Sequence, residues 1–171
     1  MVDMSNQVKF LVMDVDGTLT DGKIYMGNNG EMFKAFDIKD GCGIKNLLPQ
    51  NDIVPVIITA RKSDILLNRC KELDITHIYQ GISNKFECLE SIINTFNKDG
   101  NHYSLENVAY IGDDIIDLPC MFPIKSAGGL IGCPKDAVKE VLEISDFISS
   151  KDGGNGAVRE FIELIVKIEV I

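Results

Sequence analysis

Two aspartates separated by a single residue follow an apolar run close to the start of the chain. Asp14 and Asp16 come directly after residues 9–13, whose pattern predicts a buried strand. Residues i and i+2 of an extended segment point the same way, so the two carboxylates face one site. They repel each other unless a hard cation such as Mg²⁺ binds them. Because Gly17 lets the backbone turn close to a phosphoryl group, the pattern is typical of a metal-dependent aspartyl-phosphate enzyme.

Two other interpretations of this stretch exist. An EF-hand calcium loop also opens with alternating acids and a glycine. In this chain, however, Gly17 is the fourth residue of the loop instead of the sixth, and the twelfth is Tyr25 instead of glutamate. A solvated acidic turn after a core strand is the plainer alternative. The remaining motifs decide between such a turn and a catalytic site.

The alternation of strand and helix patterns predicts a three-layer α/β sandwich with a parallel, Rossmann-like sheet. A helix is expected after Asp40, which can cap its amino end. The other elements are predicted strands at residues 8–13, 53–58, 77–79 and 108–111, predicted helices at 63–73, 83–96 and about 156–168, and weaker alternating signals at 124–127, 135–142 and 147–148. The chain, residues 1–171, fits a single domain.

A two-stranded arm is expected at about residues 23–36. Its strands, residues 23–26 and 31–36, flank the turn Gly27–Gly30. The arm carries more apolar side chains than a free hairpin should expose. We therefore expect it to pack on another subunit.

Polar side chains recur where the predicted strands end. Thr59 closes the second strand, Lys85 begins a helix after the third, and Asp113, Asp114 and Asp117 follow the next strong strand. The carboxyl ends of parallel strands form the edge of an α/β sheet at which ligands bind. Each position alone has a plainer explanation as a turn former, a surface lysine or a helix cap. Their order after the paired aspartates favours a catalytic site.

Composition argues against several classes of partner. The formal net charge is -9 and no run of Lys or Arg is present, so nucleic acid and anionic membranes are not expected partners. The 5 cysteines form no C-x-x-C pair, as in reduced cytosolic proteins. No apolar stretch has the length of a membrane span, and no signal-peptide pattern is present. We expect a cytoplasmic location.

The ordered motifs resemble those of the haloacid dehalogenase superfamily of phosphohydrolases. The resemblance implies that Asp14 attacks phosphorus, and that Asp16 protonates the leaving oxygen and then activates water. It implies that Thr59 hydrogen-bonds the phosphoryl oxygens while Lys85 balances charge. A receiver domain of a response regulator also has a phospho-aspartate, a threonine and a lysine. It lacks an acid two residues after the acceptor, so Asp16 favours an enzyme over this signalling module.

The same resemblance implies a magnesium site. Mg²⁺ would be held by Asp14, the backbone carbonyl of Asp16 and Asp113. Asp114 and Asp117 would accept hydrogen bonds behind these ligands. Superfamily members commonly insert a cap domain between the motifs, but the intervals in this chain leave room only for the arm.

Among uncapped members, the chain resembles the 3-deoxy-D-manno-octulosonate 8-phosphate phosphatase family from about Lys9 to Glu160. The strings that carry this resemblance are DVDGTLTDG from Asp14, IYMGNNGE from Ile24, KAF from Lys34, DGCGI from Asp40, ITARK from Ile58, THIYQGISNK from Thr76, VAYIGDDIIDLP from Val108 and GAVRE from Gly156. The resemblance implies a sugar acid phosphate substrate whose product enters lipopolysaccharide biosynthesis. It also implies a homotetramer in which the arm of one subunit covers a neighbouring site.

Arg61 and Arg159 are the candidates for binding the substrate carboxylate. A guanidinium can bind a carboxylate with two parallel hydrogen bonds. Arg61 lies two residues after the motif threonine, Thr59. An ion pair at the sheet edge is the alternative for Arg61. Asn155, Ala60 and Cys42 depart from residues common in the family. Phosphatases of nine-carbon sialic-type acid 9-phosphates, and a domain fused to acylneuraminate cytidylyltransferases, are therefore alternatives.

Overall fold

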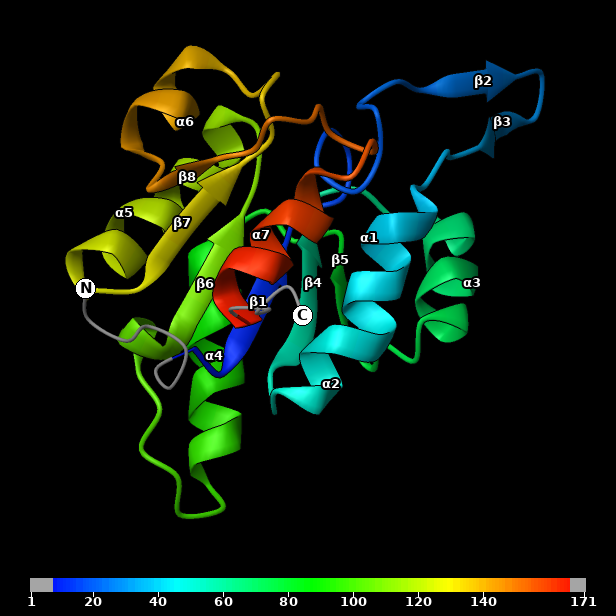
Figure 1. Cartoon of the computed structure of the whole chain (residues 1–171). Helices are drawn as coiled ribbons and strands as arrows, with labels where there is room; N and C mark the ends of the chain where they lie inside the picture. The colour runs from blue at the N-terminus through cyan, green and yellow to red at the C-terminus, as the bar shows by residue number, and fades with distance from the viewer. Residues whose placement is uncertain (1–7, 167–171) are drawn as a thin grey trace.

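The computed structural model describes residues 8–166, which fold around one six-stranded parallel sheet (Figure 1). The strands lie in the order β5-β4-β1-β6-β7-β8, each parallel to its neighbours. Their bounds are β1 Phe10–Met13, β4 Val54–Thr59, β5 His77–Gln80, β6 Val108–Ile111, β7 Leu130–Cys133 and β8 Phe147–Ile148. The predicted α/β class with a parallel Rossmann-like sheet is confirmed.

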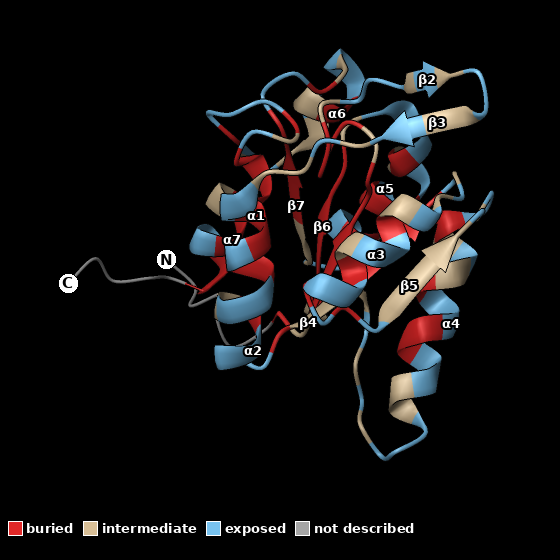
Figure 2. Ribbon diagram, turned by 90° about the vertical axis from the view of Figure 1, so that its right-hand side faces the viewer, coloured by how far each residue is buried: buried red, intermediate tan, exposed pale blue. Residues whose placement is uncertain are grey.

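Helices cover both faces of the sheet (Figure 2). Their bounds are α1 Ile38–Cys42, α2 Leu48–Gln50, α3 Asp64–Glu72, α4 Lys85–Asn97, α5 Leu118–Ser126, α6 Lys139–Ile144 and α7 Ala157–Val166. The π-helical segment η2, Gly43–Leu47, joins α1 to α2, and two 3-10 turns, η3 Leu105–Asn107 and η4 Ile115–Asp117, precede β6 and α5. The predicted end of the last helix, at residue 168, lies outside the described residues.

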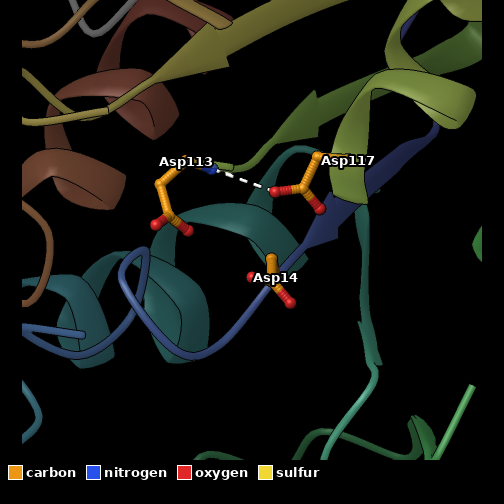
Figure 3. A group of neighbouring side chains, drawn as sticks. All are labelled: Asp14, Asp113 and Asp117. Atoms are coloured by element: carbon orange, nitrogen blue, oxygen red, sulfur yellow. Dashed lines mark hydrogen bonds between the residues drawn. The ribbon is translucent and has the colours of Figure 1, made fainter. Parts of the chain in front are cut away.

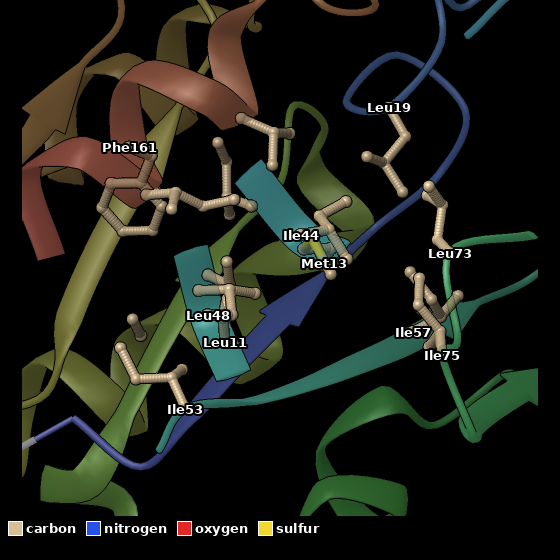
Figure 4. Packing of buried hydrophobic residues seen from close by; sticks show 14 of the residues in the cluster. Leu11, Met13, Leu19, Ile44, Leu48, Ile53, Ile57, Leu73, Ile75 and Phe161 are labelled. Carbon is tan, nitrogen blue, oxygen red and sulfur yellow. The ribbon is translucent and has the colours of Figure 1, made fainter. Parts of the chain in front are cut away.

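The central strand β1 is buried on both faces. Leu11 and Met13 point into the core beneath η2, α2, α3 and α7 (Figure 4), while Phe10 and Val12 point into the core beneath α4 and α5. All four side chains are 0% exposed. Successive residues of a strand face opposite sides, so a strand covered on both sides must be apolar throughout. That requirement makes this strand recognisable in the sequence.

The three central strands end together. Met13 of β1 is in register with Ile57 of β4 and Ile111 of β6. The residues just beyond these positions therefore emerge side by side at one edge of the sheet. This register brings Asp14 and Thr59 to the same place.

The structure differs from one local expectation and decides another. Asp37, not Asp40, caps α1 by accepting the backbone N–H groups of Lys39 and Asp40. Asp40 is buried and instead accepts the backbone N–H of Arg159, at the start of α7, over 2.7 Å. The weak signal at residues 124–127, which left strand and helix open, belongs to the end of α5 and its C-cap, Ala127. A short apolar run does not distinguish a buried helix end from a strand.

The arm forms an antiparallel hairpin that projects from the body (Figure 1). Its strands, β2 Tyr25–Gly27 and β3 Gly30–Phe33, are shorter than predicted. Met26 and Met32 are 63% and 65% exposed. Apart from this arm and the α1–α2 stretch, the described chain between β1 and β4 holds no further helix or strand, so no cap domain is present there. Among the described residues, no helix is both long and apolar enough to cross a membrane.

Candidate active site

A cavity of about 230 Å³ opens at the carboxyl edge of the sheet. Its lining comes from the ends of β1, β4 and β6 and the loops beyond them: Asp14, Asp16, Gly22, Thr59, Ala60, Arg61, Asp113, Asp114 and Ile116. A larger groove, of about 490 Å³, lies beside β5 and α4 but is lined by none of the predicted site residues. Most of the site residues predicted from the sequence therefore lie at the smaller cavity.

Asp14 lies at the base of this cavity and is only 3% exposed. Its Oδ1 accepts a hydrogen bond from Lys85 Nζ over 2.8 Å. Burial, helped by repulsion from the nearby Asp117 carboxylate, raises the pKa of Asp14 to about 7, although Lys85 opposes the rise. Burial alone would lower the pKa of Lys85, but the carboxylates of Asp14 and Asp117 raise it above its usual value. Lys85 therefore stays charged beside the proposed nucleophile.

Asp117 connects several of these groups and is fully buried. Its Oδ1 accepts hydrogen bonds from Lys85 Nζ and the Tyr110 hydroxyl, both over 2.7 Å. Its Oδ2 accepts the backbone N–H groups of Asp113 and Asp114 over 3.0 and 3.2 Å. Four donors thus occupy the two oxygens, which suits Asp117 to hold other groups in place.

Three carboxylates converge from β1 and the loop after β6 (Figure 3). One oxygen of each of Asp14, Asp113 and Asp117 lies within 4.8 Å of the others. Burial, with added repulsion from Asp14 and Asp117, raises the pKa of Asp113 to about 7. Carboxylates this close repel one another, and the raised pKa values of Asp14 and Asp113 show that both would take up a proton near neutral pH unless a cation neutralised the site. A hard divalent cation fits this set, and because the oxygens of Asp117 are occupied, Asp14 and Asp113 are the available ligands.

Asp16 faces the arm side of the cavity and contacts two cations. Lys34 Nζ lies 2.5 Å from Asp16 Oδ1, and Arg61 Nη1 lies 3.4 Å from the same oxygen. Glu31 binds both cations, at 2.9 Å from Lys34 and 3.3 Å from Arg61. Lys34 and Glu31 were assigned no chemistry from the sequence. The KAF string that begins at Lys34, which the chain shares with the family it resembles, was the only signal for Lys34. Nothing in the sequence placed the arm beside Asp16.

Gly17 lies where two loops meet the acidic cluster. Its φ is +92°, and a Cβ at this position would lie 2.0 Å from Asp113 Oδ2, so no side chain fits. The loop before α7 packs on the same turn, since a Cβ on Gly153 would lie 1.9 Å from Gly17 O. The backbone N–H of Gly154 donates to Thr18 O over 3.0 Å, and Thr18 Oγ1 donates to Asp113 over 3.0 Å. The glycine-rich loop therefore supports the turn that follows Asp14.

The remaining predicted residues divide into those at the cavity and one that lies elsewhere. Thr59, 2% exposed, ends β4 and lines the cavity, as does Arg61. Asp114 also lines it and accepts the backbone N–H of Ile115 as the cap of η4. Arg159 is not brought to the cavity. It lies on α7, where its Nε donates to Glu163 over 2.6 Å, so the substrate-binding role expected for it has no geometric support.

Comparison with known proteins identifies close relatives of this architecture. The chain is 41% identical over 166 residues to the 3-deoxy-D-manno-octulosonate 8-phosphate phosphatase of Escherichia coli K12, covering 97% of this chain and 83% of the relative. No protein-family model matches the chain.

Solved structures agree with the sequence comparison. The octulosonate phosphatase of Moraxella catarrhalis, in complex with magnesium, phosphate and the KDO molecule, superposes with a TM-score of 0.84 at 38% identity, covering 96% of this chain and 88% of that one. The cobalt-bound octulosonate phosphatase of Haemophilus influenzae gives a TM-score of 0.85 at 34% identity, covering 96% and 90%. The fold is thus shared with phosphatases that have been solved with divalent metals.

Proposed function

The chain belongs to the 3-deoxy-D-manno-octulosonate 8-phosphate phosphatase family of the haloacid dehalogenase superfamily, and from this membership and the geometry of its cavity we propose the residues that carry its reaction. The chain is a magnesium-dependent phosphatase that hydrolyses 3-deoxy-D-manno-octulosonate 8-phosphate. The observation that carries the assignment is the buried Asp14, held by Lys85, beside a second acid that opens on the same cavity.

We propose that Asp14 is the nucleophile. Its oxygen attacks phosphorus as the bond to the sugar oxygen breaks, and Asp16 gives its proton to that oxygen. Water then attacks the aspartyl-phosphate, passes a proton to Asp16, and releases phosphate and the Asp14 carboxylate. Thr59, at the end of β4, is placed to hydrogen-bond the phosphoryl oxygens. Lys85 offsets the negative charge that gathers on Asp14 and the transferring group.

Asp14, Asp113 and the backbone carbonyl of Asp16 are the groups we propose to hold the cation. When bound, Mg²⁺ supplies positive charge that stabilises the phosphoryl oxygens and relieves the repulsion between the carboxylates. Asp117 holds the backbone of Asp113 and Asp114, and Asp114 caps η4. Both therefore support the ligands from behind.

Arg61 is the proposed partner of the substrate carboxylate. Its side chain is 40% exposed and lines the cavity, and its contacts with Asp16 and Glu31 are 3.4 and 3.3 Å long. These are loose contacts for a guanidinium, which can turn toward a substrate carboxylate and bind it with two hydrogen bonds. Arg61 would thus select sugar acid phosphates over neutral sugar phosphates.

We also propose a homotetramer assembled through the arm. The exposed apolar side chains of the arm, Ile24, Met26, Met32 and Phe33, would be covered by neighbouring subunits. Residues 1–171 would form one domain in each subunit, with the arm at 23–36. The 5 cysteines are free, which suits the reducing cytoplasm, where we propose that the reaction takes place.

A substrate panel tests the assignment. We expect kcat/KM for the eight-carbon octulosonate 8-phosphate to exceed that for a nine-carbon sialic-type acid 9-phosphate by about tenfold or more, because one extra carbon unit changes the fit of the substrate. Replacing Arg61 with methionine should remove most of this activity while leaving hydrolysis of p-nitrophenyl phosphate, which has no carboxylate, nearly unchanged. A preference for the nine-carbon substrate would overturn the eight-carbon assignment.

A further inference from the structure

Lys34 is a buried lysine that the mechanism above does not use. Its side chain is only 2% exposed, yet its ammonium lies at the cavity side of the arm, 2.5 Å from Asp16 Oδ1 and 2.9 Å from Glu31 Oε1. A buried charge is costly unless it is paired, and these two carboxylates are the partners that pay this cost. Lys34 therefore has a fixed position beside the proposed acid and base.

Glu31 anchors Lys34 from the other side. Its Oε2 accepts a hydrogen bond over 2.8 Å from the hydroxyl of Ser63, which is the residue before α3. Burial opposes ionisation of Glu31, but the bonds from Lys34 and Ser63 outweigh it and lower its pKa. Glu31 is thus a charged anchor. It connects the arm to the body of the protein and limits the positions that the Lys34 ammonium can take.

The two cations beside Asp16 differ in their access to the cavity. Arg61 is 40% exposed and contacts Asp16 loosely, whereas Lys34 is covered by its own chain. When Arg61 turns toward a substrate carboxylate, Lys34 is the cation that stays with Asp16. Arg61 can thus bind the substrate while Lys34 keeps the Asp16 carboxylate paired.

We propose that Lys34 is a positioning residue that holds the Asp16 carboxyl group in place for both of its proton transfers. This inference rests on the function proposed above. In the first transfer the proton moves from Asp16 to the sugar oxygen as the phosphorus–oxygen bond breaks. In the second, the proton of the attacking water moves to Asp16 as the bond between phosphorus and Asp14 breaks. Because Lys34 and Glu31 belong to the arm, the arm supplies part of the acid–base machinery of its own subunit.

The test compares Lys34→Met with Lys34→Arg and with a control, Lys45→Met. Lys45, in η2, has a side chain that is 45% exposed, pairs with Asp74 and does not line the cavity. A misplaced catalytic group costs on the order of 10²-fold in rate. We expect Lys34→Met to lower kcat for octulosonate 8-phosphate by about this factor with little change in KM. Lys34→Arg should recover part of the loss, and the control should match the wild type.

Comparing substrates with different leaving groups distinguishes a positioning role of Lys34 from a purely structural one. p-Nitrophenolate leaves without a proton, so in Lys34→Met the first turnover of p-nitrophenyl phosphate should stay fast. A burst equal to the enzyme concentration should precede slow turnover, because water activation still needs Asp16. Rapid quenching with mass spectrometry should then find phosphate accumulated on Asp14.

Other outcomes overturn the proposal. An equal loss on both substrates without a burst would mean that Lys34 only supports the fold, and a rise in KM alone would mean that it binds substrate. Unchanged kinetics would mean that Asp16 needs no such support. If the wild type hydrolyses p-nitrophenyl phosphate but not the sugar phosphate, the substrate assignment fails, while the burst comparison still tests Lys34.

Discussion

The carboxylate of Asp117 accepts the backbone N–H of Asp113 over 3.0 Å, so one buried acid fixes the backbone of another that faces the cavity. The same carboxylate holds Lys85, which in turn binds Asp14. Asp117 therefore sets the positions of both proposed metal ligands and of the cation beside the nucleophile. Replacing Asp117 should therefore weaken metal binding, although we do not propose Asp117 as a ligand.

Asp117→Asn should weaken Mg²⁺ binding by about 10-fold to 100-fold, the usual cost of losing a group that orients metal ligands. The amide keeps one accepting oxygen instead of two, so either Lys85 and Tyr110 or the backbone N–H groups of Asp113 and Asp114 lose their acceptor. Titration calorimetry with Mg²⁺ measures the change. Asp74→Asn is the control, because Asp74 is exposed, pairs with Lys45 and does not line the cavity. Equal losses in the two variants would contradict the special role of Asp117.

Asp14→Asn should abolish turnover and the phosphorylated intermediate while the protein stays folded. The substitution removes the attacking oxygen but changes neither the size of the side chain nor the apolar packing of β1. It also removes one of the buried charges that repel each other, so the metal-free variant should melt no lower than the wild type at pH 8. Circular dichroism and quench mass spectrometry provide the two readouts. Retained phosphorylation elsewhere in the chain would exclude Asp14 as the nucleophile.

Mg²⁺ should stabilise the fold more at pH 8 than at pH 6. In the metal-free protein the pKa values of Asp14 and Asp113 are raised to about 7, mainly by burial. A carboxyl group whose folded pKa is raised contributes stability at low pH, and this contribution is lost as the pH rises through the folded pKa. The cation binds the deprotonated carboxylates and compensates for that loss. Melting curves with and without Mg²⁺ at both pH values measure the effect, and an equal shift at both would contradict it.

Asp40→Asn should remove a pH dependence of stability between about pH 4 and pH 6. Burial raises the pKa of Asp40 to about 6, although the backbone N–H of Arg159 opposes the rise. The wild type should therefore lose on the order of 1 to 3 kcal/mol as Asp40 deprotonates across this window. The asparagine oxygen can still accept the Arg159 N–H and cap α7. Denaturant unfolding with saturating Mg²⁺, which keeps Asp14 and Asp113 from titrating, compares the two proteins.

A wild type that unfolds with the same free energy at pH 4.5 and pH 6.5 would show that Asp40 is not the titrating group. Asp37→Asn serves as the control. Asp37 caps α1 from a half-buried position and adds only a minor part to the raised pKa of Asp40, so its replacement should alter stability while leaving most of the pH dependence.

The sequence by itself determined the class of fold and the chemistry of the cavity. A strand buried on both faces must be apolar, so β1 was visible as a run of large side chains, and the acids that follow it had to lie at the sheet edge. The same local logic located Thr59, Lys85 and Asp113. These predictions need only the periodicity of a strand and the parallel arrangement of its neighbours.

Only the tertiary structure decided which distant groups meet. Lys34 and Glu31 follow no core strand. Lys34 reaches Asp16, and Glu31 pairs with Lys34, because the chain that returns from the arm passes beside the cavity. Asp40 had the pattern of a cap for its own helix, but it caps α7, more than one hundred residues later. Arg159 matched a family string and yet lies away from the cavity. Local patterns record which face of an element is buried, whereas the partner of a polar side chain depends on how whole elements pack against one another.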